Sequence, residues 1–379
     1  MFVTTISGFL PQFEMSDVEL AEELGCNIHY ASDFENSIYP FDQDALIKKG
    51  IKLHRISVKK NPARFFDNFR AFVSLRRIID REEIDMIHCH NPMGGVVARA
   101  AARFSKRHPY VIYTAHGFHF YDGAPLKNWL LYYPAEKFLA RWTDRIITIN
   151  REDYLRAVKF HVRKKWNVSQ IHGVGVDPDR FRPRPEIRES KRKEIEVPAD
   201  AFHIVTAAEL NDNKNQKVII EAIAAIKSDR IYYSICGKGP NEEKLKELIG
   251  KYDLSDRVRL LGYRTDMEEI LQTADVFAFP SKREGFGVAA VEALLSGVPL
   301  IASDTRGIRE YAVDGGNSII CRSGSAIEYA EAINRFAEDK EMLERYSALC
   351  RDSALKFTTD EIRKSMRPIY EDAIMRVGK

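Results

Sequence analysis

The stretch Asp275–Asp304, DVFAFPSKREGFGVAAVEALLSGVPLIASD, contains a strand, a turn, a helix and a second strand in succession. DVFAFPS and PLIASD are short apolar runs, and Val288, Val291, Leu294 and Leu295 follow helical spacing between them. Apolar strands that alternate with helices are typical of a parallel sheet covered on both faces. The stretch therefore predicts a doubly wound α/β fold.

The same alternation runs through most of the chain. Strands are expected in the runs FVTTI, CNIHYAS, IKLHRISV, DMIHCHN, YVIYTAHG, DRIITIN, FHIVTAAEL, IYYSICG, RVRLLGY and SIIC. A stretch rich in proline and charge separates the two series, so we expect a Rossmann-like domain over 1–172, a linker over 173–198 and a second such domain over 199–357. The last segment, 358–379, is expected to be a helix that breaks near Pro368 and packs on either domain. The ligand of such a chain is expected in a central cleft that the two domains face.

Composition describes an ordinary globular protein. The 379 residues are 45% apolar and 30% charged, and the net charge of +3 is too small to indicate a nucleic-acid partner. The five cysteines are scattered without CxxC spacing, which argues against a disulfide framework or a zinc knuckle and fits a reducing compartment. No window reaches the roughly 18 apolar residues of a membrane span. We therefore expect a cytoplasmic protein.

Two acidic residues flank the Gly-Phe-Gly turn of the opening stretch. A helix that begins at this turn would leave the amides of Gly285, Phe286, Gly287 and Val288 unpaired, and such amides attract an anion. Glu292 lies eight positions after Glu284, two turns along if both belong to one helix. Because carboxylates pair well with vicinal diols, the pattern favours a diphosphate flanked by two diol-bearing rings, which is a nucleotide sugar. The alternative is that Glu284 only offsets the helix dipole and Glu292 only pairs with a lysine.

The segment EGFGVAAVE resembles the E-x7-E signature of the retaining glycosyltransferases of GT-B fold, usually called family 4. HNPMGGVVARAAA, YTAHGFHF, GVGVDPDRF, AAELNDNKNQ, CGKGPNEEKL and LGYRTDMEEILQTADVFAFPS resemble further blocks of the family in the expected order. The resemblance covers nearly the whole chain. TAHGFHFYDGAPLKNWLLYYPAEKFLAR is also similar to the bacterial members that build capsular and exopolysaccharide repeat units.

The resemblance implies a role for each matching residue of the second domain. Glu284 and the amides that begin at Gly285 would hold the transferred sugar, and Glu292 would bind the ribose diol. Lys214 would contact the diphosphate, where an ammonium neutralises charge as the sugar–phosphate bond breaks; otherwise it is a surface lysine in a polar loop. Tyr263 and Arg264 match the turn that contacts the base, mostly through its backbone.

In the first domain, the resemblance implies two further contacts. His116 would approach the transferred sugar near its hydroxymethyl group, as a positioning group more than a proton acceptor. Gly8 would bring backbone close to the phosphates and the acceptor. Without the resemblance these are a hydrogen-bonded loop histidine and a turn glycine. Where many members carry a second phosphate-binding arginine, this chain has Glu209, so Lys214 is more isolated or Arg283 assists it.

No metal site is expected. DPD at Asp177–Asp179 and DQD at Asp42–Asp44 mimic a cation motif of another glycosyltransferase fold, but we place the first at the domain hinge and the second in a loop. HCH puts His88 and His90 on one face of a strand, as in some metal hydrolases, without an evident third ligand or acid.

A basic and aromatic helix is expected over Lys59–Arg77, KKNPARFFDNFRAFVSLRR. Such a helix could lie on an anionic bilayer, or its phenylalanines could be core and its cations a solvated face. The aromatic run NWLLYYP, beside the presumed acceptor face, favours peripheral contact with the inner face of the cell membrane.

Together these observations predict a metal-independent retaining hexosyltransferase that needs no cofactor. Its donor would be a nucleotide sugar, most simply a UDP-sugar, and its acceptor a lipid-linked saccharide of bacterial surface polysaccharide synthesis. Two alternatives stay open: a sugar-nucleotide epimerase of the same fold, and a non-catalytic nucleotide-sugar-binding partner of a polysaccharide assembly complex.

Overall fold

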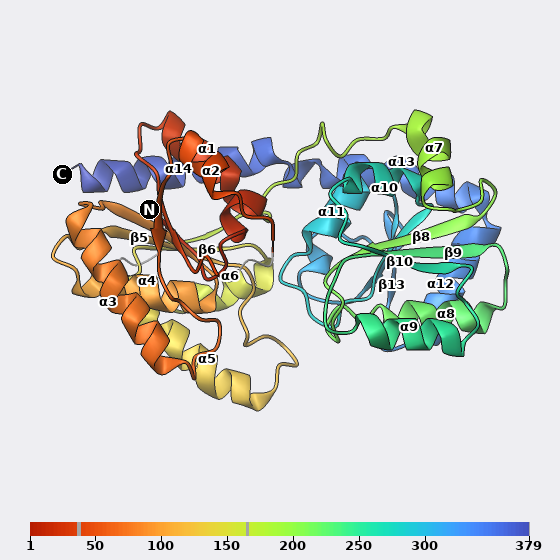
Figure 1. Ribbon diagram of the computed structural model, residues 1–379, viewed down its shortest axis with the longest axis horizontal. Coiled ribbons are helices and arrows are strands. Elements are labelled where there is room, and N and C mark those ends of the chain that lie inside the picture. Colours follow the sequence, from red (N-terminus) through yellow and green to blue (C-terminus); the bar gives the residue numbers. More distant parts are fainter. Residues whose placement is uncertain (36–38, 164–166, 379) are drawn as a thin grey trace. The chain divides into compact units, whose positions relative to one another are not determined.

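The computed structural model describes residues 1–35, 39–163 and 167–378, and it consists of two compact units (Figure 1). The first unit comprises Met1–Gly175 together with Thr359–Lys379, and the second comprises Val176–Thr358. Each unit contains its own parallel sheet and its own apolar core. The C-terminal segment therefore belongs to the first unit.

Within the described residues, the first unit has a seven-stranded parallel sheet in the order β3-β2-β1-β4-β5-β6-β7. The strands are β1 Phe2–Val3, β2 His29–Ser32, β3 Lys52–Arg55, β4 Met86–His90, β5 Tyr110–Ala115, β6 Arg145–Thr148 and β7 Val168–Gln170. Strands β1, β2 and β5 are buried along their whole length, and β4 and β6 except for their first residue, as expected for a sheet covered on both faces.

The helices of the first unit form two layers. They are η1 Leu10–Glu14, α1 Met15–Glu23, α2 Gln43–Lys48, α3 Phe65–Arg81, α4 Pro92–Phe104, α5 Leu126–Leu139, η2 Ala140–Trp142, α6 Arg151–Ala157 and α14 Thr359–Val377. Helices α1 and α14 pack together on one face, and α3, α4 and α5 cover the other (Figure 1).

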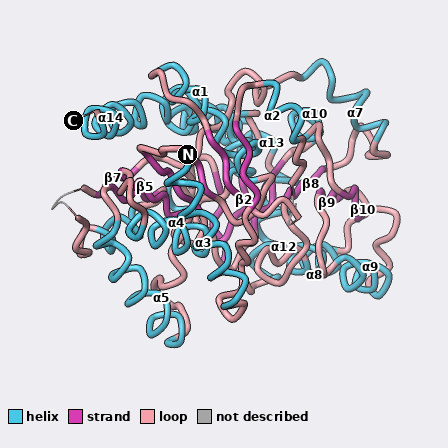
Figure 2. The backbone as a smooth tube through the Cα atoms, turned by 60° about the vertical axis from the view of Figure 1, so that its left-hand side comes forward, coloured by secondary structure: helices cyan, strands magenta, loops and turns pink. Residues whose placement is uncertain are grey.

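The second unit repeats this plan with a six-stranded parallel sheet in the order β10-β9-β8-β11-β12-β13, in the part of the chain that the structure describes. Its strands are β8 Phe202–Ala207, β9 Ile231–Cys236, β10 Val258–Gly262, β11 Val276–Phe279, β12 Leu300–Ser303 and β13 Ser318–Cys321. In Figure 2, β8, β9 and β10 follow one another across this sheet.

The helices of the second unit are also layered. They are η3 Pro185–Ile187, α7 Arg188–Glu194, α8 Lys217–Ile226, α9 Glu242–Lys251, α10 Met267–Thr273, α11 Val288–Leu295, η4 Ile308–Glu310, α12 Ala326–Glu338, α13 Lys340–Ala354 and η5 Leu355–Phe357. Helices α8, α9 and α12 lie on one face, and α7, α10, α11 and α13 on the other (Figure 1).

The strand order reverses direction once in each sheet. In the first unit the reversal falls between β1 and β4, and in the second between β8 and β11. The loops that leave the carboxyl ends of such a strand pair diverge to opposite faces, which opens a crevice where ligands of open α/β sheets bind. This topology determines where each unit can hold a ligand.

Most of the stretch expected to link the domains, 173–198, is packed on the second unit. Arg192 of α7 is almost fully buried: its guanidinium donates to the carbonyl of Thr273 at 2.9 Å, to that of Ala201 at 2.9 Å and to the Asp275 carboxylate at 2.8 Å. The charge-rich sequence did not reveal this packing, because a sequence alone does not distinguish a buried arginine from a solvated one.

Three smaller expectations were wrong. Helix α14 continues through Pro368 without breaking. Asp42–Asp44 does not lie in a loop: Asp42 caps α2, and its carboxylate accepts the Ala45 amide at 3.0 Å. Strand β7 was missed, since its residues Val168–Gln170 are short and only half-buried at the edge of the sheet.

Replacing Arg192 by Ala should lower the free energy of unfolding by about 3 kcal/mol, because it leaves the carbonyls of Thr273 and Ala201 without a buried donor, while Asp275 keeps Arg188 as a partner. Urea denaturation followed by circular dichroism measures the change. Lys193→Ala is the matched control, since Lys193 is the next residue on α7 and is exposed. Equal stabilities of the two variants would show that 176–198 is a linker after all.

Candidate functional site

Lys214 and Glu284 meet at the reversal point of the second sheet. Lys214 follows β8, Glu284 follows β11, and the lysine Nζ lies 2.6 Å from the glutamate Oε2. The Lys214 side chain is 21% exposed and the Glu284 side chain 14%, so the pair is accessible from solvent. The ammonium also lies 5.2 Å from the centre of the Phe279 ring. Two residues that the sequence separates by 70 positions therefore form one charged site.

Main-chain bonds hold these two loops together. The Lys282 amide donates to the Asn213 carbonyl at 2.8 Å, and the Asn213 side chain donates to the Arg283 carbonyl at 2.9 Å. The Lys214 amide donates to the Asn211 side chain at 3.0 Å. The positions of both charged residues are thus fixed by backbone contacts, which limits the reorganisation that ligand binding requires.

The glycine turn has a definite steric cause. Gly287 has φ of 91°, and a Cβ there would meet the Phe279 ring at 2.6 Å and the Tyr311 hydroxyl at 2.7 Å. The Tyr311 hydroxyl donates to the carbonyl of Phe286 at 2.8 Å, and the Phe286 side chain is buried. Only glycine fits this backbone conformation beside these rings.

Helix α11 begins later than the sequence suggested. It covers Val288–Leu295 and is preceded by Gly287 in the left-handed region, so Glu284 lies in the loop before the helix. The expectation that Glu284 and Glu292 lie two turns apart on one helix was therefore wrong. Within the described residues no side chain caps the start of α11, so the first amides of the helix, that of Val288 among them, point out of its N-terminal end. The dipole of α11 thus still favours an anion beside Lys214.

Glu292 lies within α11 in a half-buried position. Burial raises the pKa of its carboxyl to about 7; Arg180 opposes this shift and Glu268 adds to it. Arg180 is itself paired with Glu268 at 2.8 Å. A carboxyl group that changes charge near neutral pH is typical of functional positions.

Tyr263 and Arg264 follow β10 and differ in availability. Tyr263 is 44% exposed. The Arg264 guanidinium is tied to Asp266 at 2.5 Å and to Glu194 at 2.7 Å. Its side chain is therefore held by carboxylates of the same unit, and the contact of this turn with a base stays a prediction.

Glu209 is exposed at the start of the loop that follows β8. Lys214 has a carboxylate, that of Glu284, as its direct partner, and the assistance of a second cation stays a prediction. Arg283, the proposed assistant, is half-buried in the same turn as Glu284.

Gly8 lies in the loop after β1 of the first unit. A Cβ there would meet the Tyr39 carbonyl oxygen at 2.5 Å, so the close approach of another main chain requires glycine. This steric reason alone accounts for a glycine at position 8, and a contact of Gly8 with phosphates or acceptor stays a prediction.

His116 belongs to a buried polar cluster at the reversal point of the first sheet. Its Nε2 lies 3.1 Å from Nδ1 of His90 and 3.6 Å from Oε1 of Glu14, which ends η1. Burial lowers the pKa of His116 to about 4 and that of His90 well below its usual value. Burial, together with the nearby Asp17 carboxylate, raises the pKa of Glu14.

The HCH motif divides between two structural roles. His88 bonds the Tyr370 hydroxyl and the Thr114 hydroxyl, each at 2.7 Å, whereas His90 faces His116. Sequence reasoning missed Glu14 and the pairing of His90 with His116. The positions of the two histidines at the ends of β4 and β5 were the available signal for their pairing, and no signal marked Glu14. The DPD aspartate Asp177 accepts the amides of Asp179 and Arg180 at 2.9 and 3.1 Å, as in an ordinary turn.

Comparison with known proteins supports the assignment of the fold. The structure superimposes on Anabaena Alr3699/HepE, solved in complex with UDP and glucose, with a TM-score of 0.80 over 98% of each chain at 19% identity. Two parallel-sheet units with these neighbours define a GT-B fold.

Sequence matches define the family. The model of glycosyl transferases group 1 matches residues 187–351, and that of glycosyl transferase 4-like proteins matches residues 19–150. EpsD of Bacillus subtilis (strain 168), which is named as a glycosyltransferase, is 37% identical over 98% of this chain and 95% of its own. An Escherichia coli UDP-Gal:alpha-D-GlcNAc-diphosphoundecaprenol alpha-1,3-galactosyltransferase is 27% identical over 81% of this chain and 80% of its own.

The fold and the matches define a GT-B glycosyltransferase. The chain belongs to the family of group 1 and family 4-like glycosyltransferases.

Proposed function

We propose that this enzyme transfers a hexosyl group from a UDP-sugar to a lipid-linked saccharide with retention of the anomeric configuration, in the synthesis of a bacterial surface polysaccharide. The observation that carries the proposal is the Lys214–Glu284 pair beside the uncapped start of α11. A cation, a carboxylate and a helix N-terminus at one reversal point suit a diphosphate with a sugar attached.

In this proposal the second unit binds the donor. The diphosphate lies against Lys214 and the first amides of α11. Glu284 accepts hydrogen bonds from hydroxyls of the transferred sugar, and the amides of Gly285, Phe286 and Gly287 donate to oxygens of that sugar. Glu292 binds the ribose diol. The base packs on the turn at Tyr263 and Arg264. A solved neighbour, Alr3699/HepE, has been captured with UDP-glucose, which supports the choice of nucleotide.

The leaving group is the diphosphate. Its negative charge grows as the anomeric bond breaks, and the Lys214 ammonium and the helix dipole stabilise that charge, so the step needs no metal ion on the phosphates. With retention, the acceptor attacks from the side of the leaving group, and the diphosphate takes the acceptor proton. No separate general base is then required. Gly8 and His116 of the first unit would position the acceptor and the sugar.

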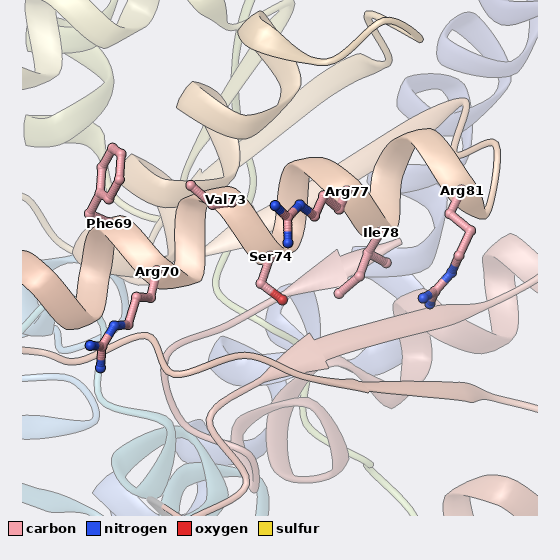
Figure 3. Close-up of a pocket in the computed structure, with 7 residues that line it drawn as sticks. All are labelled: Phe69, Arg70, Val73, Ser74, Arg77, Ile78 and Arg81. Atoms are coloured by element: carbon pink, nitrogen blue, oxygen red, sulfur yellow. The ribbon is translucent and has the colours of Figure 1, made fainter.

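The acceptor is proposed to be lipid-linked because an exposed apolar and basic surface lies on the first unit. On α3, Phe65, Phe66 and Phe69 are 66%, 78% and 53% exposed, which contradicts a core role for them. A groove of about 480 Å³ along α3 is lined by Arg70, Arg77 and Arg81 among others (Figure 3). Helix α5 exposes Leu126 and Leu130 as well.

Such a surface suits peripheral contact with an anionic bilayer, where aromatic side chains enter the interface and guanidinium groups meet phosphate headgroups. In the described residues, no helix has the length and apolar character to cross a membrane. The Escherichia coli relative is named for an acceptor on diphosphoundecaprenol, a lipid carrier, which also favours this type of acceptor.

Two other functions make different predictions. A sugar-nucleotide epimerase would convert a UDP-sugar without any acceptor, so product analysis with the donor alone distinguishes it. A non-catalytic partner of an assembly complex would bind the nucleotide and turn nothing over. Turnover measured with donor and acceptor together distinguishes the second, because a binding module would use the same cation to hold the diphosphate.

Replacing Lys214 by Ala should lower kcat by about a hundredfold or more at saturating UDP-sugar, because the variant lacks the cation that stabilises the leaving diphosphate. UDP release measured with an extract of lipid-linked saccharides reports the rate. Lys282→Ala is the matched control, since Lys282 is an exposed lysine in the adjoining loop. Full turnover of the Lys214 variant would contradict the assignment.

The affinity for UDP should rise between pH 6 and pH 8, because Glu292 with its pKa of about 7 becomes a carboxylate that accepts both ribose hydroxyls. Each charge-assisted bond contributes about 1.5 to 3 kcal/mol, so Glu292→Gln should weaken binding at pH 8 by about tenfold or more. Calorimetry at several pH values measures this.

The Glu292→Gln variant also corrects for the ionisation of UDP itself, whose phosphate titrates near pH 6. The raised pKa of Glu292 also affects the free energy of unfolding. Its contribution to stability is fully present below pH 4.5 and is lost as the pH rises through 7. If the affinity for UDP changed with pH in the same way in the wild type and in the Glu292→Gln variant, the assignment of Glu292 to the ribose would be wrong.

Replacing Phe65, Phe66 and Phe69 together by Ser should reduce binding to phosphatidylglycerol vesicles about fivefold or more, because the apolar contribution of α3 is lost. Co-sedimentation measures the bound fraction. The control is Ile327→Ser with Leu349→Ser, which removes exposed apolar side chains from the second unit. Equal loss in both variants would mean that α3 is not the contact surface.

A further inference from the structure

Glu14, His90 and His116 form a three-residue cluster in the first unit. Glu14 ends η1, His90 ends β4 and His116 follows β5, so three separate elements contribute one side chain each. The side chains of Glu14 and His90 are 5% and 0% exposed, and that of His116 is 18% exposed. The cluster is therefore largely closed to bulk water.

The three facing atoms are almost equally spaced. His90 Nδ1 and His116 Nε2 are 3.1 Å apart, and Glu14 Oε1 lies 3.5 Å from the first and 3.6 Å from the second. A tetrahedral zinc site has metal–ligand distances of about 2.0 to 2.2 Å, which places neighbouring ligand atoms about 3.3 to 3.6 Å apart. The observed triangle has nearly these dimensions.

Hydrogen bonds within the protein leave the cluster unsatisfied. One proton can bridge the two imidazoles, but Glu14 Oε1 is buried and has no hydrogen-bond partner within the described residues. A buried carboxylate oxygen without a partner is costly. A divalent cation would bind all three atoms at once. His90 Nε2 is also buried without a partner, and the structure offers no account of that atom.

We propose that Glu14, His90 and His116 bind a zinc-type divalent ion with one ligand position left open. Two imidazoles and one carboxylate are a common zinc ligand set. The ion would fasten η1 to the ends of β4 and β5 and so fix the loop that contains Gly8. It lies in the first unit and has no part in the stabilisation of the leaving group by Lys214. In terms of the proposed function, the ion would hold the His116 imidazole in place beside the transferred sugar. The proposal departs from the expectation that the chain holds no metal.

Metal content is the direct test. Untagged full-length protein, equilibrated with Zn²⁺ at pH 7.5 and freed of excess ion by gel filtration, should retain about one zinc per chain by mass spectrometry. Glu14→Gln and His90→Gln should each weaken zinc binding at least tenfold. A wild type without stoichiometric zinc, or variants that retain it, would overturn the proposal.

The control variant is His54→Gln. His29, His54 and Glu82 form the other cluster with metal-ligand spacing in the described residues, and His54 has a histidine partner at 3.0 Å, as His90 does. This variant should retain the zinc. Loss of zinc here, with retention in the Glu14 variant, would assign the ion to the other cluster and refute the proposal.

Two measurements on the wild type do not depend on whether the variants fold. Co²⁺ in place of zinc should give the strong visible absorption of a four-coordinate site, and only weak six-coordinate bands would count against the assignment. Chelation should accelerate hydrogen exchange in Leu10–Glu14, because that segment loses its attachment to β4 and β5. Unchanged exchange would contradict the fastening role.

Discussion

Parallel strand order is the constraint on which both sites of this protein depend. In a parallel sheet all carboxyl ends lie at one edge, and where the order reverses the two leaving loops diverge. In the second unit this brings Lys214 beside Glu284 across β8 and β11. In the first, the neighbouring strands β1, β4 and β5 bring Glu14, His90 and His116 together. Neither group is local in sequence.

Lys214 and Glu284 of the second unit would exchange each other for new partners when the proposed donor binds. Without a ligand, Lys214 and Glu284 neutralise each other at 2.6 Å. A partly exposed pair of this kind contributes only about 0 to 1 kcal/mol, so separating it costs little. In the proposed reaction a diphosphate takes the lysine and sugar hydroxyls take the glutamate. Each charge therefore has a partner before and after the donor binds, and neither is left buried alone.

The sequence was sufficient for most of the fold, because the physical signal was local. Short apolar runs identified the strands of both sheets except β7, whose three residues are half-buried at an edge. The same local view failed for Arg192, since burial beside the carbonyls of Thr273 and Ala201 depends on how α7 packs. It also failed for Pro368, which lies within a continuous helix whose packing on α1 outweighs the lost hydrogen bond.

For the candidate site, the sequence allowed us to propose which residues take part, but not how they are arranged. Glu284, Lys214 and Glu292 were proposed from the sequence as site residues, but the expectation that the two glutamates share one helix was wrong, because Gly287 adopts a left-handed conformation that delays the start of α11. A glycine forced by the Phe279 ring and the Tyr311 hydroxyl is a tertiary effect. Glu14 was missed for a similar reason. Nothing in LPQFE marks it, and only the neighbouring positions of β1, β4 and β5 give it two histidine partners. Residues that act through non-local partners therefore need the strand order before their chemistry can be deduced.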